Sequence, residues 1–173
     1  LYSVFESILD PGDGVIYPVP SWNNEHYCIL TQAKSFIIET KAEDLFMPRA
    51  EAIRPFLREA NIIALNSPLN PSGTIISQQV LSDICEMIIA ENLRRSSDEK
   101  PLFLVYDQIY SYLIHGEEVH HTPISLFPEM KEYTVIIDGK KIEPTQTHFH
   151  HFDECLVREG RTVIKNDKDS DFV

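Results

Sequence analysis

The sequence predicts an α/β fold in which an open, mostly parallel sheet carries helices on both faces. Three observations predict it. Short apolar runs of the buried-strand kind alternate along the chain with segments of helical periodicity. The spacing of strand, helix and strand suits parallel β/α units. Polar residues follow directly after several strands, where open α/β sheets bind their ligands.

Four helices are expected from the periodicity of their apolar residues. In chain order they span residues 1–9, 21–33, 49–60 and 78–95. Ser21 is the expected N-cap of the second helix. Pro55 keeps the third helix short or kinked, because proline lacks the backbone donor that a helix interior needs. A polar, turn-rich loop over residues 96–101 follows the fourth helix.

Five strands are expected between these helices. In chain order they span residues 15–17, 35–38, 62–65, 102–106 and 134–137. The first follows the turn Pro11–Gly14. The third is a continuous apolar run, which is typical of a strand buried on both faces. The last two are apolar runs bounded by polar residues.

Unusual polar residues follow the last three of these strands. Asn66–Gly73 follows the third strand, Asp107 the fourth, and Asp138-Gly139 the fifth. The carboxyl ends of parallel strands meet at one edge of the sheet. The sequence therefore predicts a single crevice at this edge.

Composition narrows the classes of protein that the chain can be. Its 173 residues, 43% of them hydrophobic, suffice for one domain with a core. The formal net charge of −12 argues against a nucleic-acid partner, because phosphate binding needs clustered Lys and Arg. Three widely spaced cysteines give neither a disulfide framework nor a zinc pattern, so we expect a reducing, cytoplasmic setting. No apolar run reaches the roughly 18 residues of a membrane span, and the start, which reads as the middle of a helix, indicates a fragment.

Three motifs occur in order along the chain and are more specific together than singly. Asn66–Gly73 reads Asn-Ser-Pro-Leu-Asn-Pro-Ser-Gly, Tyr106–Tyr110 reads Tyr-Asp-Gln-Ile-Tyr, and Pro18–Trp22 reads Pro-Val-Pro-Ser-Trp. They resemble the Asn-Pro-Thr-Gly, Asp-Glu-x-Tyr and Pro-x-Pro-x-Trp segments of class I, fold-type I aminotransferases, which use pyridoxal phosphate (PLP). The resemblance is to the branch that is like aspartate aminotransferase, covers residues 1–139, and implies part of the large, cofactor-binding domain.

The resemblance implies a role for each motif residue. Asp107 corresponds to the buried carboxylate that keeps the PLP ring nitrogen protonated. Asn70 and Tyr110 correspond to the donors that hold the phenolic oxygen of the cofactor. Trp22 corresponds to the aromatic ring that stacks on it. Taken singly, each residue is better explained by a turn, a cap or core packing, and only the ordered set favours a PLP site.

The chain departs from the family at the lysine to which PLP is bound covalently. Family members follow the last strand with Asn/Asp-Gly-x-Ser-Lys, whereas here Asp138-Gly139 runs into Lys140 and Lys141. The expected Ser is absent, and Ile142 stands at the expected Lys position. Lys140 and Lys141 are therefore the candidate catalytic lysines, and two solvated surface lysines are the alternative interpretation.

Residues 140–173 are expected to form a divergent polar extension after the domain at 1–139. This segment contains the cluster His148–Cys155, in which His148 and His150 would share one face of a strand and could bind a transition metal. Without a second ligand cluster, the sequence favours a solvated extension, or a foreign sequence joined to a truncated gene.

Three hypotheses follow. In the first, the chain is a PLP-dependent aminotransferase, incomplete as it stands, that transfers an amino group between an amino acid and a 2-oxo acid. In the others, it is an inactive truncated relative that acts as an interaction domain, or an unrelated α/β domain with a His-tract metal site. The resemblance also implies a homodimer with shared active sites, a Gly-rich phosphate loop before Leu1, and a carboxylate-binding arginine in a small domain.

Overall fold

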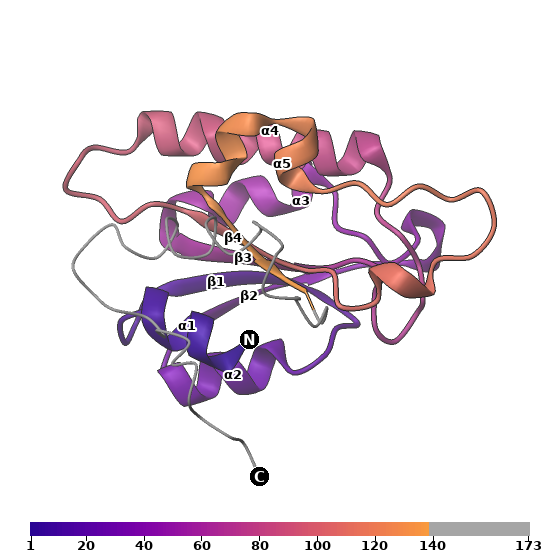
Figure 1. Cartoon of the computed structure of the whole chain (residues 1–173). Helices are drawn as coiled ribbons and strands as arrows, with labels where there is room; N and C mark the ends of the chain where they lie inside the picture. The colour runs from indigo at the N-terminus through magenta and orange to yellow at the C-terminus, as the bar shows by residue number, and fades with distance from the viewer. Residues whose placement is uncertain (139–173) are drawn as a thin grey trace, which may run out of the picture.

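The chain folds around one five-stranded sheet (Figure 1), seen in a computed structural model that describes residues 1–138. The strands are β1 (Gly14–Val19), β2 (Lys34–Glu39), β3 (Ala60–Asn66), β4 (Phe103–Asp107) and β5 (Thr134–Ile137). Their order in the sheet is β2-β1-β3-β4-β5, and all four adjacent pairs are parallel. Every strand lies within two residues of its predicted bounds.

Helices cover both faces of this sheet, which confirms the predicted fold class (Figure 1). One face carries α1 (Tyr2–Ile8) and α2 (Asn24–Thr31). The other face carries α3 (Ala50–Ile53), α4 (Gln78–Arg94) and α5 (Pro123–Leu126). Short 3-10 helices complete the connections: η1 (Ala42–Asp44), η2 (Arg54–Glu59), η3 (Ser111–Leu113) and η4 (Pro128–Glu132).

The sheet separates two apolar cores, because its central strands bury side chains on both faces. On β3, Ile62 and Ala64 pack toward α1 and α2, whereas Ile63 and Leu65 pack toward α4. All four of these side chains are buried. This two-sided burial explains why β3 is a continuous apolar run rather than an alternating one.

The helix bounds agree with the prediction at the start of α4 and at Pro55, and differ from it at the start of α2. Ser77 caps α4, since its Oγ accepts a hydrogen bond of 3.3 Å from the backbone N–H of Val80. The helix before Pro55 is short, as expected: α3 ends at Ile53, and the 3-10 helix η2 follows it. The prediction of Ser21 as a cap was wrong. Asn23 adopts a left-handed conformation (φ 59°), which breaks the chain before the helix and moves its start to Asn24.

The strand order creates a topological switch between β1 and β3. From β1 the chain crosses to β2 through α2, on one face of the sheet. From β3 it crosses in the opposite direction to β4 through α4, on the other face. Both crossovers have the same hand, and they run toward opposite edges of the sheet, so they must lie on opposite faces. The chain segments that leave β1 and β3 therefore diverge at the carboxyl ends of these two strands. Open α/β sheets bind ligands at such a point.

Several predicted features fall in the segment after Ile137. Asp138 ends the described part of the chain, while Gly139 and the expected extension at 140–173 lie outside the described residues. The extension includes the candidate lysines Lys140 and Lys141 and the tract His148–Cys155. Within residues 1–138, no helix has both the length and the apolar character needed to cross a membrane.

Candidate functional site

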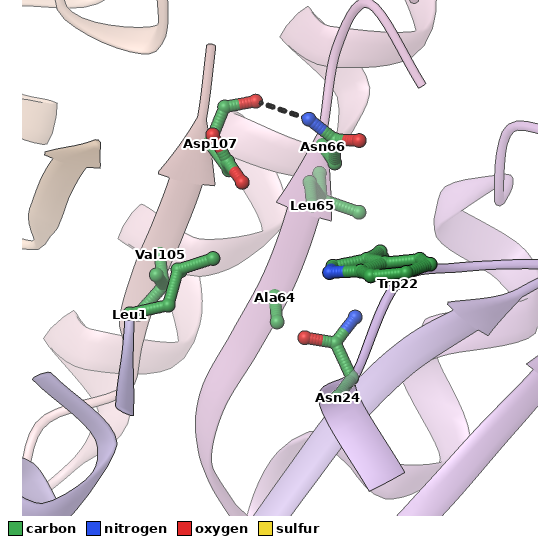
Figure 2. Close-up of a pocket in the computed structure, with 8 residues that line it drawn as sticks. All are labelled: Leu1, Trp22, Asn24, Ala64, Leu65, Asn66, Val105 and Asp107. Carbon is green, nitrogen blue, oxygen red and sulfur yellow. Dashed lines mark hydrogen bonds between the residues drawn. The ribbon is translucent and has the colours of Figure 1, made fainter. Parts of the chain in front are cut away.

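An open pocket lies at the topological switch point (Figure 2). Its walls come from β3 and β4, from the segment that leads from β1 into α2, and from the start of the chain. The lining residues are Leu1, Trp22, Asn24, Ala64, Leu65, Asn66, Val105 and Asp107. The pocket thus has an apolar floor formed by β3 and β4, with polar groups at the carboxyl ends of the strands. Such a combination is typical of a site for a small organic ligand.

Asp107, the last residue of β4, presents a carboxylate to this pocket. Its Oδ1 accepts a hydrogen bond of 3.0 Å from the backbone N–H of Ile109, which fixes the direction of the side chain. Burial raises the pKa of the Asp107 carboxyl above its ordinary value, although the Ile109 bond and the positive charge of the N-terminal ammonium act in the opposite direction. Within residues 1–138, no Lys, Arg or His side chain forms an ion pair with it. The site therefore holds a desolvated carboxylate that a cationic ligand group would stabilise.

Trp22 follows β1 and stands at the mouth of the pocket. Figure 2 shows its indole reaching in from the side opposite Asp107 and Val105. The side chain is 61% exposed, which is unusual for a tryptophan. A large aromatic surface that is left open beside a pocket is available for stacking on a flat ligand.

Asn70 and Tyr110 come from different strand-end loops and meet each other. Asn70 Nδ2 donates a hydrogen bond of 3.2 Å to the hydroxyl oxygen of Tyr110. Neither residue is among those that line the pocket. They lie next to it, because the backbone N–H of Asn70 is bound to the side chain of the lining residue Asn66. The structure thus brings Trp22 and Asp107 to the pocket itself, and the pair Asn70 and Tyr110 to its border.

Two polar groups at these strand ends had no role in the sequence interpretation. Asn66 belongs to the Asn-Pro motif segment, yet its hydrogen bonds to Asn70 and Asp107 appear only in the fold. Gln108 replaces the family's Glu, and its side chain lies between His120 and Asp138, at 3.1 Å and 3.3 Å. The sequence signals for these two residues were their places in the motif segments and their positions at the end of, or directly after, a buried strand.

The search for a metal centre within residues 1–138 gives no candidate: no group of three or more His, Cys, Asp or Glu side chains is placed to hold an ion. The proposed metal ligands His148 and His150 lie outside the described residues. The pocket is therefore the candidate site that this part of the chain offers.

Comparison with known proteins agrees with the motifs. The profile of the family "Aminotransferase class I and II" matches residues 2–138. The aspartate aminotransferase of Bacillus subtilis is 32% identical over 141 residues, which are 80% of this chain and 34% of that enzyme.

Solved structures give the same result. The aspartate aminotransferase of Thermus thermophilus with maleate superposes with a TM-score of 0.69 at 27% identity, over 80% of this chain and 33% of that one. The aspartate aminotransferase from Rhizobium meliloti gives a TM-score of 0.72 at 26% identity, with the same coverage of 80% and 33%.

The chain spans about a third of the length of the relatives that it matches. The matched third contains the pocket, the strand ends around it, and all three sequence motifs. The match extends over most of the chain rather than over one motif, so a chance likeness of turn sequences does not account for it. The chain belongs to the class I and II aminotransferase family.

Proposed function

We propose that the pocket binds PLP, and that the protein to which this chain belongs transfers an amino group between an amino acid and a 2-oxo acid. The observation that carries the proposal is the carboxylate of Asp107, which faces the pocket with a raised pKa and forms no ion pair with a Lys, Arg or His side chain in the described part of the chain. A protonated pyridine nitrogen is a cation of the right size and shape to pair with it.

The other residues at the strand ends also fit a pyridine ring with a phenolic oxygen. Trp22 offers an exposed aromatic face at the pocket, suited to stacking on the flat ring. Asn70 and Tyr110 form a pair of hydrogen-bonding groups at the border of the pocket. Both can donate to an oxygen that carries negative charge, Asn70 through its amide and Tyr110 through its hydroxyl.

In this proposal the chemistry is divided between the cofactor and the protein. PLP, when bound, supplies an electron sink. Asp107 holds a proton on the ring nitrogen, and the backbone N–H of Ile109 keeps the carboxylate in place. Asn70 and Tyr110 hold the phenolic oxygen, and Trp22 shields one ring face from water. Lys140 or Lys141, which follow Asp138-Gly139 in the sequence, would provide the amine for covalent attachment of the cofactor.

The relatives suggest which substrates and assembly to test. Those of Bacillus subtilis and Thermus thermophilus are named aspartate aminotransferase and aspartate/prephenate aminotransferase. Aspartate is therefore the first amino donor to test for the whole protein. We further propose a homodimer, as the family resemblance implies, and a cytoplasmic location. The free, buried thiols of Cys28 and Cys85 suit a reducing compartment.

Trapping with borohydride tests the covalent part of this proposal. The full chain is mixed with PLP, reduced so that any bond between PLP and a lysine becomes permanent, digested, and mapped by mass spectrometry. We expect preferential label on Lys140 or Lys141, with loss of that label in the Lys140→Arg, Lys141→Arg double variant. A label spread over the lysines in the same proportions as in the urea-unfolded chain would show that neither lysine is placed at a cofactor site.

A further inference from the structure

The side-chain amide of Asn66 connects the candidate cofactor residues of two neighbouring strands. Asn66 is the last residue of β3, pairs in register with Asp107 of β4, and lines the pocket. Its Nδ2 donates a hydrogen bond of 2.9 Å to the backbone carbonyl of Asp107, drawn as the dashed line in Figure 2. The backbone N–H of Ser67 donates to the same carbonyl, also at 2.9 Å.

The oxygen of the Asn66 side-chain amide binds a second backbone group, in the loop after β3. Asn66 Oδ1 accepts a hydrogen bond of 2.8 Å from the backbone N–H of Asn70. Asn70 in turn donates through Nδ2 to Tyr110. One side chain therefore sets the position of the Asp107 backbone and of Asn70, and through Asn70 it also reaches Tyr110.

The chemistry of the partners determines which way this amide points. A backbone N–H can only donate and a carbonyl can only accept, so the oxygen must face Asn70 and the nitrogen must face Asp107. A primary amide offers a donor and an acceptor on separate atoms, so Asn66 can serve both partners at once. An aspartate would keep the acceptor but would turn a second oxygen toward the carbonyl of Asp107.

We propose that Asn66 is a positioning residue for the cofactor site. By binding the backbone of Asp107 and of Asn70, it fixes the distance between the Asp107 carboxylate and the Asn70 side chain, and it takes no part in the chemistry itself. This inference rests on the proposed function, since it gives Asn66 a role toward PLP through residues assigned to that cofactor. The pocket needs such a device because Asp107 ends β4 whereas Asn70 lies on the loop after β3, and a small error in position weakens binding steeply.

Two substitutions separate the two halves of the amide. Asn66→Leu has a similar shape and removes both hydrogen bonds. Asn66→Asp keeps the acceptor toward Asn70 and removes the donor toward Asp107. Asn92→Leu is the matched control, because the amide of Asn92 forms an equivalent pair of bonds with Leu102, at 2.8 Å and 2.9 Å, at the opposite end of β4.

The first readout needs no cofactor. Hydrogen exchange of the backbone N–H of Asn70 is measured by NMR in the full chain and its variants. We expect exchange to be at least about tenfold faster in Asn66→Leu and close to the original rate in Asn66→Asp and Asn92→Leu, since one hydrogen bond protects this group. Unchanged protection of Asn70 in Asn66→Leu would overturn the positioning role, whatever the chain does with PLP.

The second readout is the affinity for pyridoxamine phosphate, which lacks the aldehyde of PLP and so cannot react with surface lysines. Quenching of Trp22, the single tryptophan of the chain, reports its binding. We expect about tenfold weaker binding in both Asn66 variants and no change in Asn92→Leu. Equal affinities in all variants, or an equal loss in Asn92→Leu, would contradict the inference. No binding to the unmodified chain would instead reject the proposed function, while the exchange measurement would still judge the contacts of Asn66.

Discussion

Replacing Arg95 with methionine is expected to lower the free energy of unfolding by about 3–5 kcal/mol. The Arg95 side chain is only 5% exposed, although it is one of the most polar in the chain. Its guanidinium donates to the backbone carbonyls of Leu57, Ala60 and Lys100, at 2.6, 2.7 and 2.5 Å. It also pairs with Glu91 Oε1 at 3.1 Å. Methionine fills the same space but leaves these acceptors without a donor.

The reason for so large an effect is that Arg95, the C-cap residue of α4, ties this helix to the amino ends of two central strands. Ala60 begins β3, and Lys100 precedes β4. Urea unfolding followed by circular dichroism measures the loss. Arg49→Met is the control, because Arg49 is 66% exposed and pairs with Asp44 at the surface, so its loss should cost at most about 1 kcal/mol. Equal effects of the two substitutions would show that the network around Arg95 contributes little.

Replacing Asp107 with asparagine is expected to weaken the binding of pyridoxamine phosphate by about 10- to 100-fold, the usual range for losing a hydrogen bond to a charged group. Asparagine keeps an oxygen for the N–H of Ile109 and so preserves the local backbone. It removes the negative charge that the proposed ring cation needs. Fluorescence of Trp22 measures the affinity.

The same substitution should make the chain more stable at neutral pH. Burial raises the pKa of Asp107 in the folded state, so the ionised carboxylate destabilises the fold relative to the protonated form. The protonated Asp107 carboxyl stabilises the fold fully at a pH below the pKa that it has in the unfolded chain. This stabilisation is lost as the pH rises through the higher pKa that it has in the folded chain. The advantage of Asp107→Asn should therefore appear near neutral pH and vanish as the pH falls toward about 4, the ordinary pKa of aspartate.

Asp83→Asn is the control for both measurements. Asp83 lies on α4, on the opposite face of the sheet, where it accepts a hydrogen bond from Gln79. Its substitution makes the same chemical change and should leave both the affinity for pyridoxamine phosphate and the stability at neutral pH unchanged. Should Asp107→Asn bind the ligand as tightly as the unmodified chain does, the carboxylate would not be the partner of the ring.

The fold could be predicted from the sequence because its signals are local. Each strand is a short apolar run with polar ends, and Pro55 keeps its helix short because it has no backbone N–H to donate. The start of α2 could not be predicted in this way. Asn23 and Ser21 are both good helix caps by type, and only the left-handed turn at Asn23 decides between them.

The site could be predicted only as far as individual positions. Asp107 and Trp22 follow strands, and the strand order then brings both to one pocket. The bridge through Asn66 depends on the register of β3 against β4, which pairs Asn66 with Asp107. No local pattern carries that register, because it is set by packing across the sheet.

The claim that the switch-point pocket is a PLP site is tested most directly by mapping where pyridoxamine phosphate binds. The full chain, labelled with 15N, is titrated with this ligand and, separately, with inorganic phosphate. We predict saturable shifts at the Trp22 indole N–H and at the side-chain amides of Asn66 and Asn70, absent with phosphate alone and strongly reduced in Asp107→Asn. Shifts confined to residues away from the carboxyl ends of β1, β3 and β4, or shifts that Asp107→Asn leaves unchanged, would contradict the account.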